Sequence, residues 1–182
     1  MTMLKKNVVV ISTSLRPGSN SDILSDKFAA GAMDAGHNVT KITLAGKDIK
    51  FCRGCLICQN IGHCSIPDDA NAIMEKVLES DVVVWATPIY YYEMSGQMKT
   101  LIDRMNAMYC LEYRFRDVYL LTTAEESGPE TPRGAETGLM GWVKCYPKSR
   151  LAGTVFCGGV TGARDITGNA KLAEAYSMGL NI

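Results

Sequence analysis

The 182-residue chain has no long run of charges of one sign, and its 19 basic and 19 acidic residues cancel. A neutral, mixed surface argues against nucleic acid or a membrane surface as the main partner. No apolar stretch approaches the ~18 residues of a membrane span. The first apolar run, Val8–Ile11, is too short for the core of a signal peptide. We therefore expect a cytoplasmic protein without a nucleic-acid or membrane partner.

Two common phosphate-binding signatures are also missing, since neither G-x-x-x-x-G-K-[ST] nor G-x-G-x-x-G occurs. No internal repeat, low-complexity tract or linker divides the chain. Its length suits one domain with a sizeable buried core. We expect a single domain over residues 1–182.

Cysteine, by contrast, is concentrated. Four of the seven cysteines fall within thirteen residues in the spacing C-x2-C-x2-C-x5-C, namely Cys52, Cys55, Cys58 and Cys64. In a reducing compartment, clustered cysteines indicate metal or redox chemistry rather than disulfides. Three interpretations stay open for this cysteine-rich loop at about residues 48–66. They are a [4Fe–4S] cluster, free redox-sensitive thiols, and zinc, for which the spacing is unusual.

Apolar runs alternate with helical patterns along the chain. The runs predict five strands, at Asn7–Ser12, Val39–Leu44, Val82–Thr87, Val118–Thr123 and Gly153–Cys157. Apolar residues at helical spacing predict helices over about 24–35, 68–78, 98–108, 135–143 and 172–180. This alternation implies an α/β fold, a doubly wound parallel sheet with right-handed crossovers and helices on both faces. Ligands of such sheets bind outside the carboxyl ends of the strands.

The loop after the first strand, residues 12–21, has the sequence S-T-S-L-R-P-G-S-N-S and leads into a helix. Helix N-terminal N–H groups, short hydroxyls and a guanidinium together form a phosphate site. A capped helix start with a surface Arg is the simpler alternative, because Ser and Asn also favour N-caps. The residues alone leave both open.

The loop after the third strand, residues 87–96, has the sequence T-P-I-Y-Y-Y-E-M-S-G. Its aromatic faces suit a flat ring. The alternative is that the tyrosines pack at the domain edge or at a subunit interface. Three consecutive tyrosines cannot all face inward, so at least one should be accessible.

These two loops, followed by Q-M-K-T-L-I-D-R, resemble the NADPH-dependent FMN reductase family of flavodoxin-like proteins. The cysteine spacing is similar to that of the iron–sulfur flavoproteins in this group. The resemblance covers almost the whole chain and implies a flavodoxin-like five-stranded sheet with strand order 2-1-3-4-5.

By that resemblance, three sets of residues should bind FMN. The phosphate should contact Ser14, Arg16, Ser19, Asn20 and Ser21. The isoalloxazine should be lined by Pro88, Ile89, Tyr90 and Tyr91, with Gly96 close by, and its pyrimidine edge should be reached by Thr123, Ala124 and Glu125. In the iron–sulfur interpretation, the cluster ligands would be Cys52, Cys55, Cys58 and Cys64.

The resemblance implies an FMN-dependent oxidoreductase that takes hydride from NAD(P)H and passes electrons to a small-molecule or protein acceptor. It also implies a homodimer or homotetramer. Two alternatives are a flavodoxin-like electron carrier and a thiol-based redox sensor. Carriers are usually strongly acidic, so the neutral charge of this chain favours the reductase. Flavin carries the redox chemistry itself, and we assign no side chain as a catalytic acid or base.

The remaining chemically active side chains are expected to have structural roles. In the central helices, capping and surface pairs are expected of Lys99, Asp103 and Arg104. Buried apolar packing is expected of the isolated cysteines, Cys110, Cys145 and Cys157. We assign no function to His37 or His63.

Overall fold

The structure is a computed structural model and describes residues 4–182. Its strands are β1 (Asn7–Ser12), β2 (Asn38–Thr43), β3 (Val82–Tyr90), β4 (Glu93–Met94), β5 (Asp117–Thr123) and β6 (Arg150–Cys157). Its helices are α1 (Asn20–Asp34), α2 (Cys58–Ile61), α3 (Asp69–Glu79), α4 (Gly96–Arg104), the 3-10 helix η1 (Met105–Met108), α5 (Arg133–Lys144) and α6 (Lys171–Leu180). Within residues 4–182, none of the helices combines the length and the apolar character that crossing a membrane requires.

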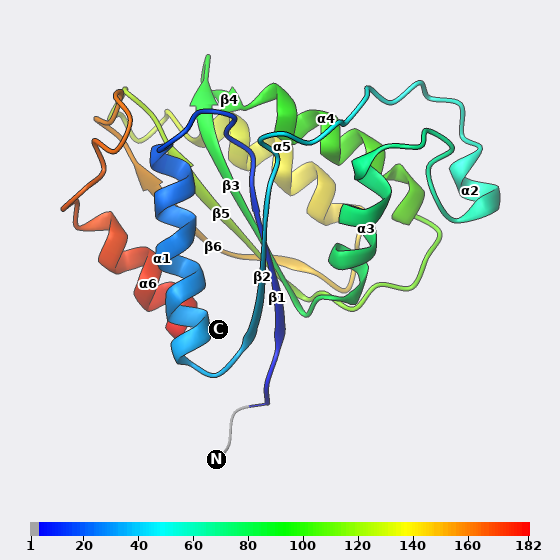
Figure 1. Cartoon of the computed structure of the whole chain (residues 1–182), viewed down its shortest axis with the longest axis horizontal. Coiled ribbons are helices and arrows are strands. Elements are labelled where there is room, and N and C mark those ends of the chain that lie inside the picture. The colour runs from blue at the N-terminus through cyan, green and yellow to red at the C-terminus, as the bar shows by residue number, and fades with distance from the viewer. Residues whose placement is uncertain (1–3) are drawn as a thin grey trace.

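Five strands form a parallel sheet in the order β2-β1-β3-β5-β6 (Figure 1). The chain runs outward from β1 to β2 and then returns to the other side of β1 with β3. Helices α1 and α6 cover one face, and α3, α4 and α5 cover the other. The predicted doubly wound sheet with order 2-1-3-4-5 is therefore confirmed when the five parallel strands are counted alone.

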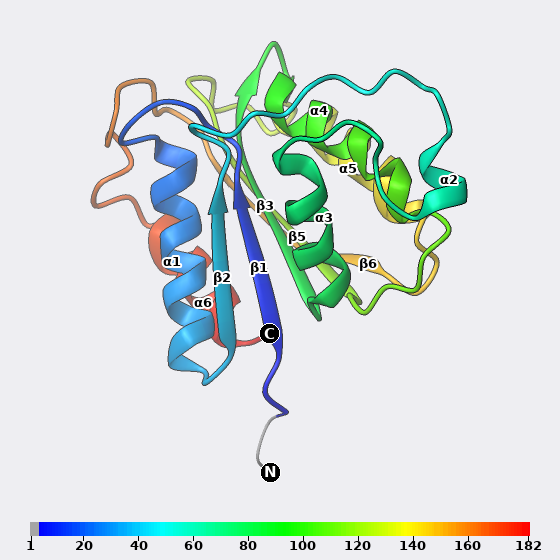
Figure 2. The ribbon, with the colours of Figure 1, turned by 45° about the vertical axis from the view of Figure 1, so that its right-hand side comes forward.

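The sixth strand, β4, was not predicted. It pairs antiparallel with the end of β3, through Ile89 with Met94 and Tyr90 with Glu93. Two residues are too few to show the alternation that marks a strand in sequence. The resulting β3–β4 hairpin rises at the edge of the sheet where the parallel strands end (Figure 2).

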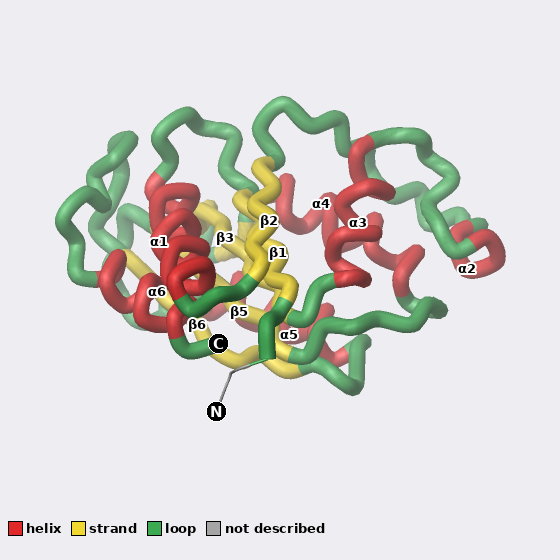
Figure 3. The backbone as a smooth tube through the Cα atoms, turned by 60° about the horizontal axis from the view of Figure 1, so that its bottom comes forward, coloured by secondary structure: helices red, strands yellow, loops and turns green. Residues whose placement is uncertain are grey.

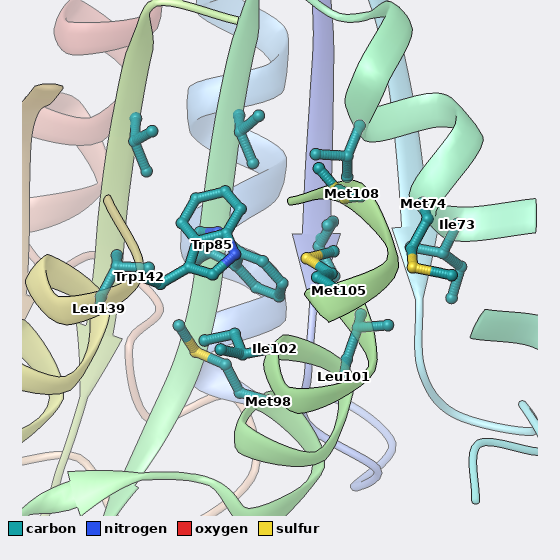
Figure 4. Close-up of a cluster of buried hydrophobic side chains, with 14 of the residues drawn as sticks. Ile73, Met74, Trp85, Met98, Leu101, Ile102, Met105, Met108, Leu139 and Trp142 are labelled. Atoms are coloured by element: carbon teal, nitrogen blue, oxygen red, sulfur yellow. The ribbon is translucent and has the colours of Figure 1, made fainter. Parts of the chain in front are cut away.

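Each face of the sheet has its own hydrophobic core. On the α3–α4–α5 side, Trp85 of β3 meets Trp142 of α5 edge to face, with ring centroids 5.9 Å apart (Figure 4). On the α1–α6 side, Phe28 packs against Tyr119 with centroids 5.2 Å apart. Because both faces are covered, the central strands are apolar throughout, as the sequence indicated.

Two helix starts are capped by side chains. Asp68 accepts a hydrogen bond from the Ala70 N–H at the start of α3, and Ser95 accepts one from the Met98 N–H at the start of α4. The helix predicted over residues 98–108 is interrupted, because α4 ends at Arg104 and the chain continues as η1. These caps fix the loops that lead into both helices.

Candidate functional site

One buried threonine joins the loop after β1 to β3 and to the start of α4. Thr13 Oγ1 donates to the Ala86 carbonyl at 3.0 Å and lies 3.0 Å from Ser95 Oγ. Ser95 is itself buried and caps α4. The loop after β1 and the loop after β3 therefore hold fixed positions relative to each other.

The N-terminus of α1 has no side-chain cap. Ser19 occupies the cap position, but its hydroxyl lies 3.0 Å from Ser21 Oγ instead of accepting from the first-turn N–H groups. Nearby, Ser14 Oγ accepts from the Arg16 N–H at 3.3 Å. A helix start whose N–H groups are unsatisfied by side chains attracts anions. The capped start that the sequence left open is therefore not what this chain forms.

The segment after β6 closes the other side of this loop. Arg16 Nη1 donates to the Thr161 carbonyl at 2.8 Å. The Asn20 side chain donates to the Gly162 carbonyl at 2.9 Å and accepts from the Ile166 N–H at 3.2 Å. Asn20 thus uses both ends of its amide to hold two loops together.

The sequence did not single out this segment, although a signal was present. The last predicted strand runs directly into G-G-V-T-G at residues 158–162. The rule that ligands bind beyond the carboxyl ends of parallel strands applies to this strand as well. Only its side-chain contacts to the first loop show that it belongs to the same site.

Ten of the thirteen predicted cofactor residues line one cavity of about 210 Å³. They are Ser14, Arg16, Ser19, Asn20, Pro88, Ile89, Tyr90, Thr123, Ala124 and Glu125. Val160 and Thr161, from the segment after β6, complete the lining. Loops separated by more than a hundred residues in sequence therefore meet at the edge where the parallel strands end.

The loop after β5 is held by its backbone. The Ala124 N–H donates to the Cys157 carbonyl at 3.1 Å, and the Ala124 carbonyl accepts from the Val160 N–H at 2.9 Å. The Glu125 carbonyl accepts from the Gly159 N–H at 3.0 Å. This ladder continues the β5–β6 pairing beyond the sheet and gives the cavity a rigid wall.

The remaining three predicted residues lie outside this cavity. Ser21 is buried and turned toward Ser19. Gly96 lines a second cavity, of about 690 Å³, which shares Tyr90 with the first. Tyr91 is fully exposed at 100%. For all thirteen residues the predicted contact with FMN stays a prediction.

Tyr91 and Tyr92 form the two-residue turn of the β3–β4 hairpin. Both have left-handed backbone conformations, with φ of 50° and 63°. Such turns favour Asn-Gly, because a residue with a Cβ costs about 1–2 kcal/mol in this region. The α5 residue Gly134 allows the turn to approach, since a Cβ there would lie 2.2 Å from the Tyr92 carbonyl oxygen. All three tyrosines are exposed, which agrees with the prediction that at least one is accessible.

The four clustered cysteines do not converge. Cys58 is buried and accepts a hydrogen bond from Asn106 Nδ2 at 3.4 Å, whereas Cys52 and Cys55 are exposed. The N–H of Ile57 is the main cause of a lowered pKa at the Cys55 thiol. Within residues 4–182, no three His, Cys, Asp or Glu side chains lie close enough together to hold a metal ion. In this arrangement the thiols do not fit a four-thiolate cluster site.

The three isolated cysteines differ from the prediction in two cases. Cys157 is buried, as expected, but Cys110 and Cys145 are exposed. Cys145 lies at the C-terminal end of α5, where its thiol donates to the Gly141 carbonyl at 3.4 Å. The apolar character of cysteine predicts burial on average, but it does not say which residue of a helix end faces the solvent.

Arg104 is buried, so the prediction of a capping or surface role is wrong for this residue. Its side chain and that of Asp68 are both 0% exposed. The two groups form a bidentate ion pair, in which the Nη1–Oδ2 distance is 2.6 Å and the Nη2–Oδ1 distance is 2.9 Å. Arg104 also donates to the carbonyls of Lys50 and Ile66, at 2.7 and 3.3 Å, and to Cys64 Sγ at 3.2 Å. One guanidinium therefore holds both ends of the cysteine-rich loop against α4.

Between these ends the cysteine-rich loop extends away from the sheet. The short helix α2, which begins at Cys58, lies at the periphery of the molecule (Figures 1 and 3). The loop leaves β2 at the same edge of the sheet as the cavity loops. The base of the loop is thus close to the site, while its cysteines are spread along a projecting segment.

The parallel sheet of order β2-β1-β3-β5-β6, with helices on both faces, places the chain in the flavodoxin-like class of folds. A family model described as NADPH-dependent FMN reductase matches residues 6–133. The chain belongs to this family.

Curated relatives include proteins named for flavin and iron–sulfur chemistry. An iron–sulfur flavoprotein of Methanocaldococcus jannaschii is 35% identical over 97 residues, which cover 53% of this chain and 50% of the relative. A Bacillus subtilis protein named as an NAD(P)H-dependent FMN-containing oxidoreductase is 33% identical over 99 residues, with coverage of 53% and 50%. The match spans about half the length of these relatives.

Solved structures share the fold along nearly the whole chain. An NAD(P)H:quinone oxidoreductase from Methanothermobacter marburgensis aligns with a TM-score of 0.79 at 16% identity and covers 98% of this chain and 96% of its own. An azoreductase from Bacillus anthracis aligns with a TM-score of 0.71 at 18% identity, with coverage of 97% and 99%. At these identities the likeness shows the fold alone.

Proposed function

We propose that this chain is an FMN-dependent oxidoreductase that takes hydride from NAD(P)H and passes electrons to an acceptor. The observation that carries the proposal is the uncapped start of α1 beside the 210 Å³ cavity that three sequence-distant loops form. Membership of the NADPH-dependent FMN reductase family supports it. FMN, when bound, supplies the hydride and electron chemistry, and the chain supplies binding and orientation.

The donors around the start of α1 fit a terminal phosphate monoester. Ser14 and Ser19 offer hydroxyls, and Arg16 has N–H groups left after its bond to the Thr161 carbonyl. A phosphate is best bound by a helix N-terminus combined with charge-assisted side-chain bonds. The chain has no dinucleotide fingerprint, which favours FMN over FAD.

The cavity wall fits the edge of a flat ring. Pro88, Ile89 and Tyr90 form one side, and the backbone-anchored loop that includes Ala124 and Glu125 forms another. Ligand pockets usually measure ~300–1,000 Å³, so a cavity of about 210 Å³ encloses only part of FMN. In the proposed reductase, the hydride donor would have to reach the part of the ring that lies outside this cavity.

The proposal is tested by titrating the purified chain with FMN and FAD and then adding NADPH or NADH without oxygen. We expect tight FMN binding, weaker FAD binding, and bleaching of the flavin absorbance by reduced nicotinamide. If only a reduced partner protein bleaches the flavin, the chain is an electron carrier instead. Preference for FAD would contradict the assignment of the phosphate site.

Arg16→Ala is expected to weaken FMN binding by about 1.5–3 kcal/mol, the scale of a charge-assisted hydrogen bond. Arg16→Lys keeps the charge but loses the planar fork, so it should recover only part of the affinity. Arg114→Ala is the matched control, because Arg114 pairs with Asp81 at the opposite edge of the sheet. FMN titration measures all three, and an unchanged affinity in Arg16→Ala would remove Arg16 from the site.

An iron–sulfur cluster is a second candidate cofactor, favoured by the C-x2-C-x2-C-x5-C spacing and by the names of the relatives. The thiols as arranged do not form such a site, so binding a cluster requires the projecting loop to refold. Anaerobic reconstitution with iron and sulfide tests it. Four irons per chain, lost in Cys58→Ser, would support the cluster; no iron uptake with intact flavin reduction would leave FMN as the resident cofactor.

Assembly as a homodimer or homotetramer also stays a proposal. Large exposed side chains, such as Phe51, Tyr91 and Tyr109, support it. Exposed apolar surface of this kind marks interaction sites when it is contiguous. Sedimentation of the purified chain gives the oligomeric state directly.

A further inference from the structure

The segment between β6 and α6, residues 158–170, lies beside the loop that leads into α1 (Figures 1 and 2). In addition to the side-chain contacts already described, a backbone contact joins the two, because the Arg164 N–H donates to the Gly18 carbonyl at 3.0 Å. Gly18 directly precedes Ser19, the residue at the cap position of α1. Arg164 is therefore anchored beside the helix start at which the phosphate of FMN is proposed to bind.

The backbone of Arg164 is left-handed, with φ of 67°. This conformation costs free energy for a residue with a Cβ, and it persists where the surrounding structure over-determines it. The Arg164 carbonyl also accepts hydrogen bonds from the Thr167 N–H at 2.9 Å and from Thr167 Oγ1 at 2.7 Å. Contacts on both sides of its Cα therefore fix the direction in which the Arg164 side chain leaves the backbone.

The side chain of Arg164 lies over Gly18. A Cβ added to Gly18 would lie 3.3 Å from Arg164 Nε and 3.4 Å from Arg164 Cγ, so the missing side chain leaves room for the arginine. Gly18 is itself left-handed, with φ of 67°, a conformation that favours glycine. The loop thus presents bare backbone to a guanidinium directly before the helix cap.

This guanidinium is exposed and, within residues 4–182, forms neither an ion pair nor a hydrogen bond with a protein acceptor. The adjacent carboxylate, Asp165, instead accepts from the Thr161 and Gly162 N–H groups, at 3.2 and 2.5 Å. Asp22, the acidic residue in the first turn of α1, pairs with Lys41 at 2.8 Å. The carboxylates nearest in sequence to the helix start and to Arg164 are therefore engaged elsewhere.

We propose that Arg164 is a second guanidinium donor to the phosphate of FMN and that it sets the preference of the chain for FMN over riboflavin. The inference rests on the proposed function, because it concerns the phosphate of the cofactor bound at the start of α1. A phosphate monoester carries about −1.5 to −2 charges at pH 7 and three acceptor oxygens. One guanidinium does not neutralise this charge, whereas two do.

The two arginines have different roles in this arrangement. Arg16 lines the cavity and also holds the segment after β6 through the Thr161 carbonyl. Arg164 lies outside the lining of the cavity, next to Gly18. Any residue could form its backbone bonds to Gly18 and Thr167, and glycine would form them with less strain. What arginine adds at this position is the planar fork of N–H donors that matches a phosphate.

The first test compares FMN with riboflavin, which lacks the phosphate. Arg164→Gly removes the guanidinium and suits the left-handed backbone. The Kd for FMN should rise about tenfold, the scale of one charge-assisted hydrogen bond at an exposed site, while the Kd for riboflavin stays unchanged. Titration followed by flavin fluorescence measures both. An unchanged Kd for FMN, or equal weakening of both flavins, would overturn the inference and leave the proposed function intact.

Three further variants separate charge from structure. Arg164→Ala keeps the backbone strain, so it should be less stable than Arg164→Gly but bind FMN equally weakly. Arg164→Lys restores the charge and should recover part of the affinity. Lys27→Ala removes another exposed cation of α1 and should bind FMN as the unmodified chain does. FMN affinity that follows stability, or an equal loss in Lys27→Ala, would contradict a direct contact.

The phosphorus resonance of bound FMN gives a readout that a purely structural role would not change. A nearby guanidinium favours the dianion and lowers the second pKa of the phosphate. In Arg164→Gly, the midpoint of the pH titration should therefore rise toward the value of about 6 for a free monoester. A midpoint equal to that of the unmodified chain would overturn the inference. Failure of the unmodified chain to bind either flavin would contradict the proposed function, and this inference with it.

Discussion

Replacing Arg104 with Met is expected to lower the free energy of unfolding by about 3–5 kcal/mol, the scale for removing one partner of a buried ion pair. The reason is that Asp68 would remain 0% exposed with its charge unpaired. Met approximates the length of the lost side chain, so the change reports mainly charge and hydrogen bonding. Urea denaturation followed by circular dichroism and tryptophan fluorescence measures it.

Arg114→Ala is the matched control. Arg114 also forms a 2.6 Å ion pair, with Asp81, but its side chain is 58% exposed. Solvated pairs of this kind contribute about 0–1 kcal/mol. Equal losses of stability in the two variants would contradict the claim that burial makes the Arg104 pair important.

The loss in Arg104→Met should depend on pH. Burial opposes ionisation of Asp68, but hydrogen bonds from Arg104 and from the Lys50 and Ala70 N–H groups outweigh it and lower the pKa of Asp68. A lowered pKa stabilises the fold above the unfolded pKa of about 3.9, and the contribution disappears as the pH falls through the folded value. Removing Arg104 raises this pKa, so the stability difference between the variant and the unmodified chain should shrink on acidification. A difference that stays constant as the pH is lowered from about 4 through the lowered folded pKa of Asp68 would contradict this account.

Arg104 also links stability to the site. Its bonds to the Lys50 and Ile66 carbonyls and to Cys64 Sγ hold the ends of the cysteine-rich loop. In Arg104→Met, amide hydrogens at the base of this loop should exchange faster than they do in the unmodified chain. Exchange of the α1 amide hydrogens should not change. Arg104 is a positioning residue in this sense.

The fold was predictable because its signals are local. Each of the five predicted parallel strands is present, with bounds within a few residues of those expected. Apolar β-branched runs mark strands covered on both faces, and Asp68 was expected at the helix start that it caps. The loops after the first, third and fourth predicted strands were also expected to meet, since parallel strands end at one edge. Ten predicted residues do share a cavity there.

The features that were missed depend on long-range contacts. Arg104 looks like any helix-end arginine until Asp68, 36 residues earlier in the chain, is placed beside it. The contacts of Asn20 with Gly162 and Ile166 span more than 140 residues. No local pattern predicts such pairs. The cysteine spacing is a local pattern as well, and it indicates how many thiols are present without fixing whether they converge.

Gly31→Ala is expected to lower the free energy of unfolding by at least about 2 kcal/mol, because overpacking against a rigid neighbour is destabilising. Gly31 of α1 faces α6, where an added Cβ would lie 2.0 Å from the Tyr176 carbonyl oxygen. The contact is reciprocal, since a Cβ on Gly179 of α6 would lie 2.1 Å from the Phe28 carbonyl oxygen. Both obstructing atoms belong to backbone, so only a movement of the helices relieves the clash.

Gly141→Ala should have the opposite sign. Gly141 is an exposed residue of α5, and an added Cβ there meets no atom within 4 Å. Alanine in an open helical position gains about 0.5–1 kcal/mol over glycine. Chemical denaturation of both variants, at two protein concentrations to separate folding from assembly, gives the comparison. Destabilisation by both substitutions would show that helix propensity and open space do not govern these positions.

The Gly31→Ala substitution should also weaken FMN binding at the proposed cofactor site, because Ser19 and Asn20 lie at the start of α1. Asn20 binds the segment after β6 through hydrogen bonds of 2.9 and 3.2 Å, a geometry that tolerates little movement of the helix. If α1 moves away from α6, the start of the helix shifts relative to the cavity, and FMN affinity should fall together with stability. Gly141→Ala leaves α1 in place and should bind FMN as the unmodified chain does. Loss of stability in Gly31→Ala with unchanged FMN affinity would show that the start of α1 is positioned by its loop contacts rather than by its packing on α6.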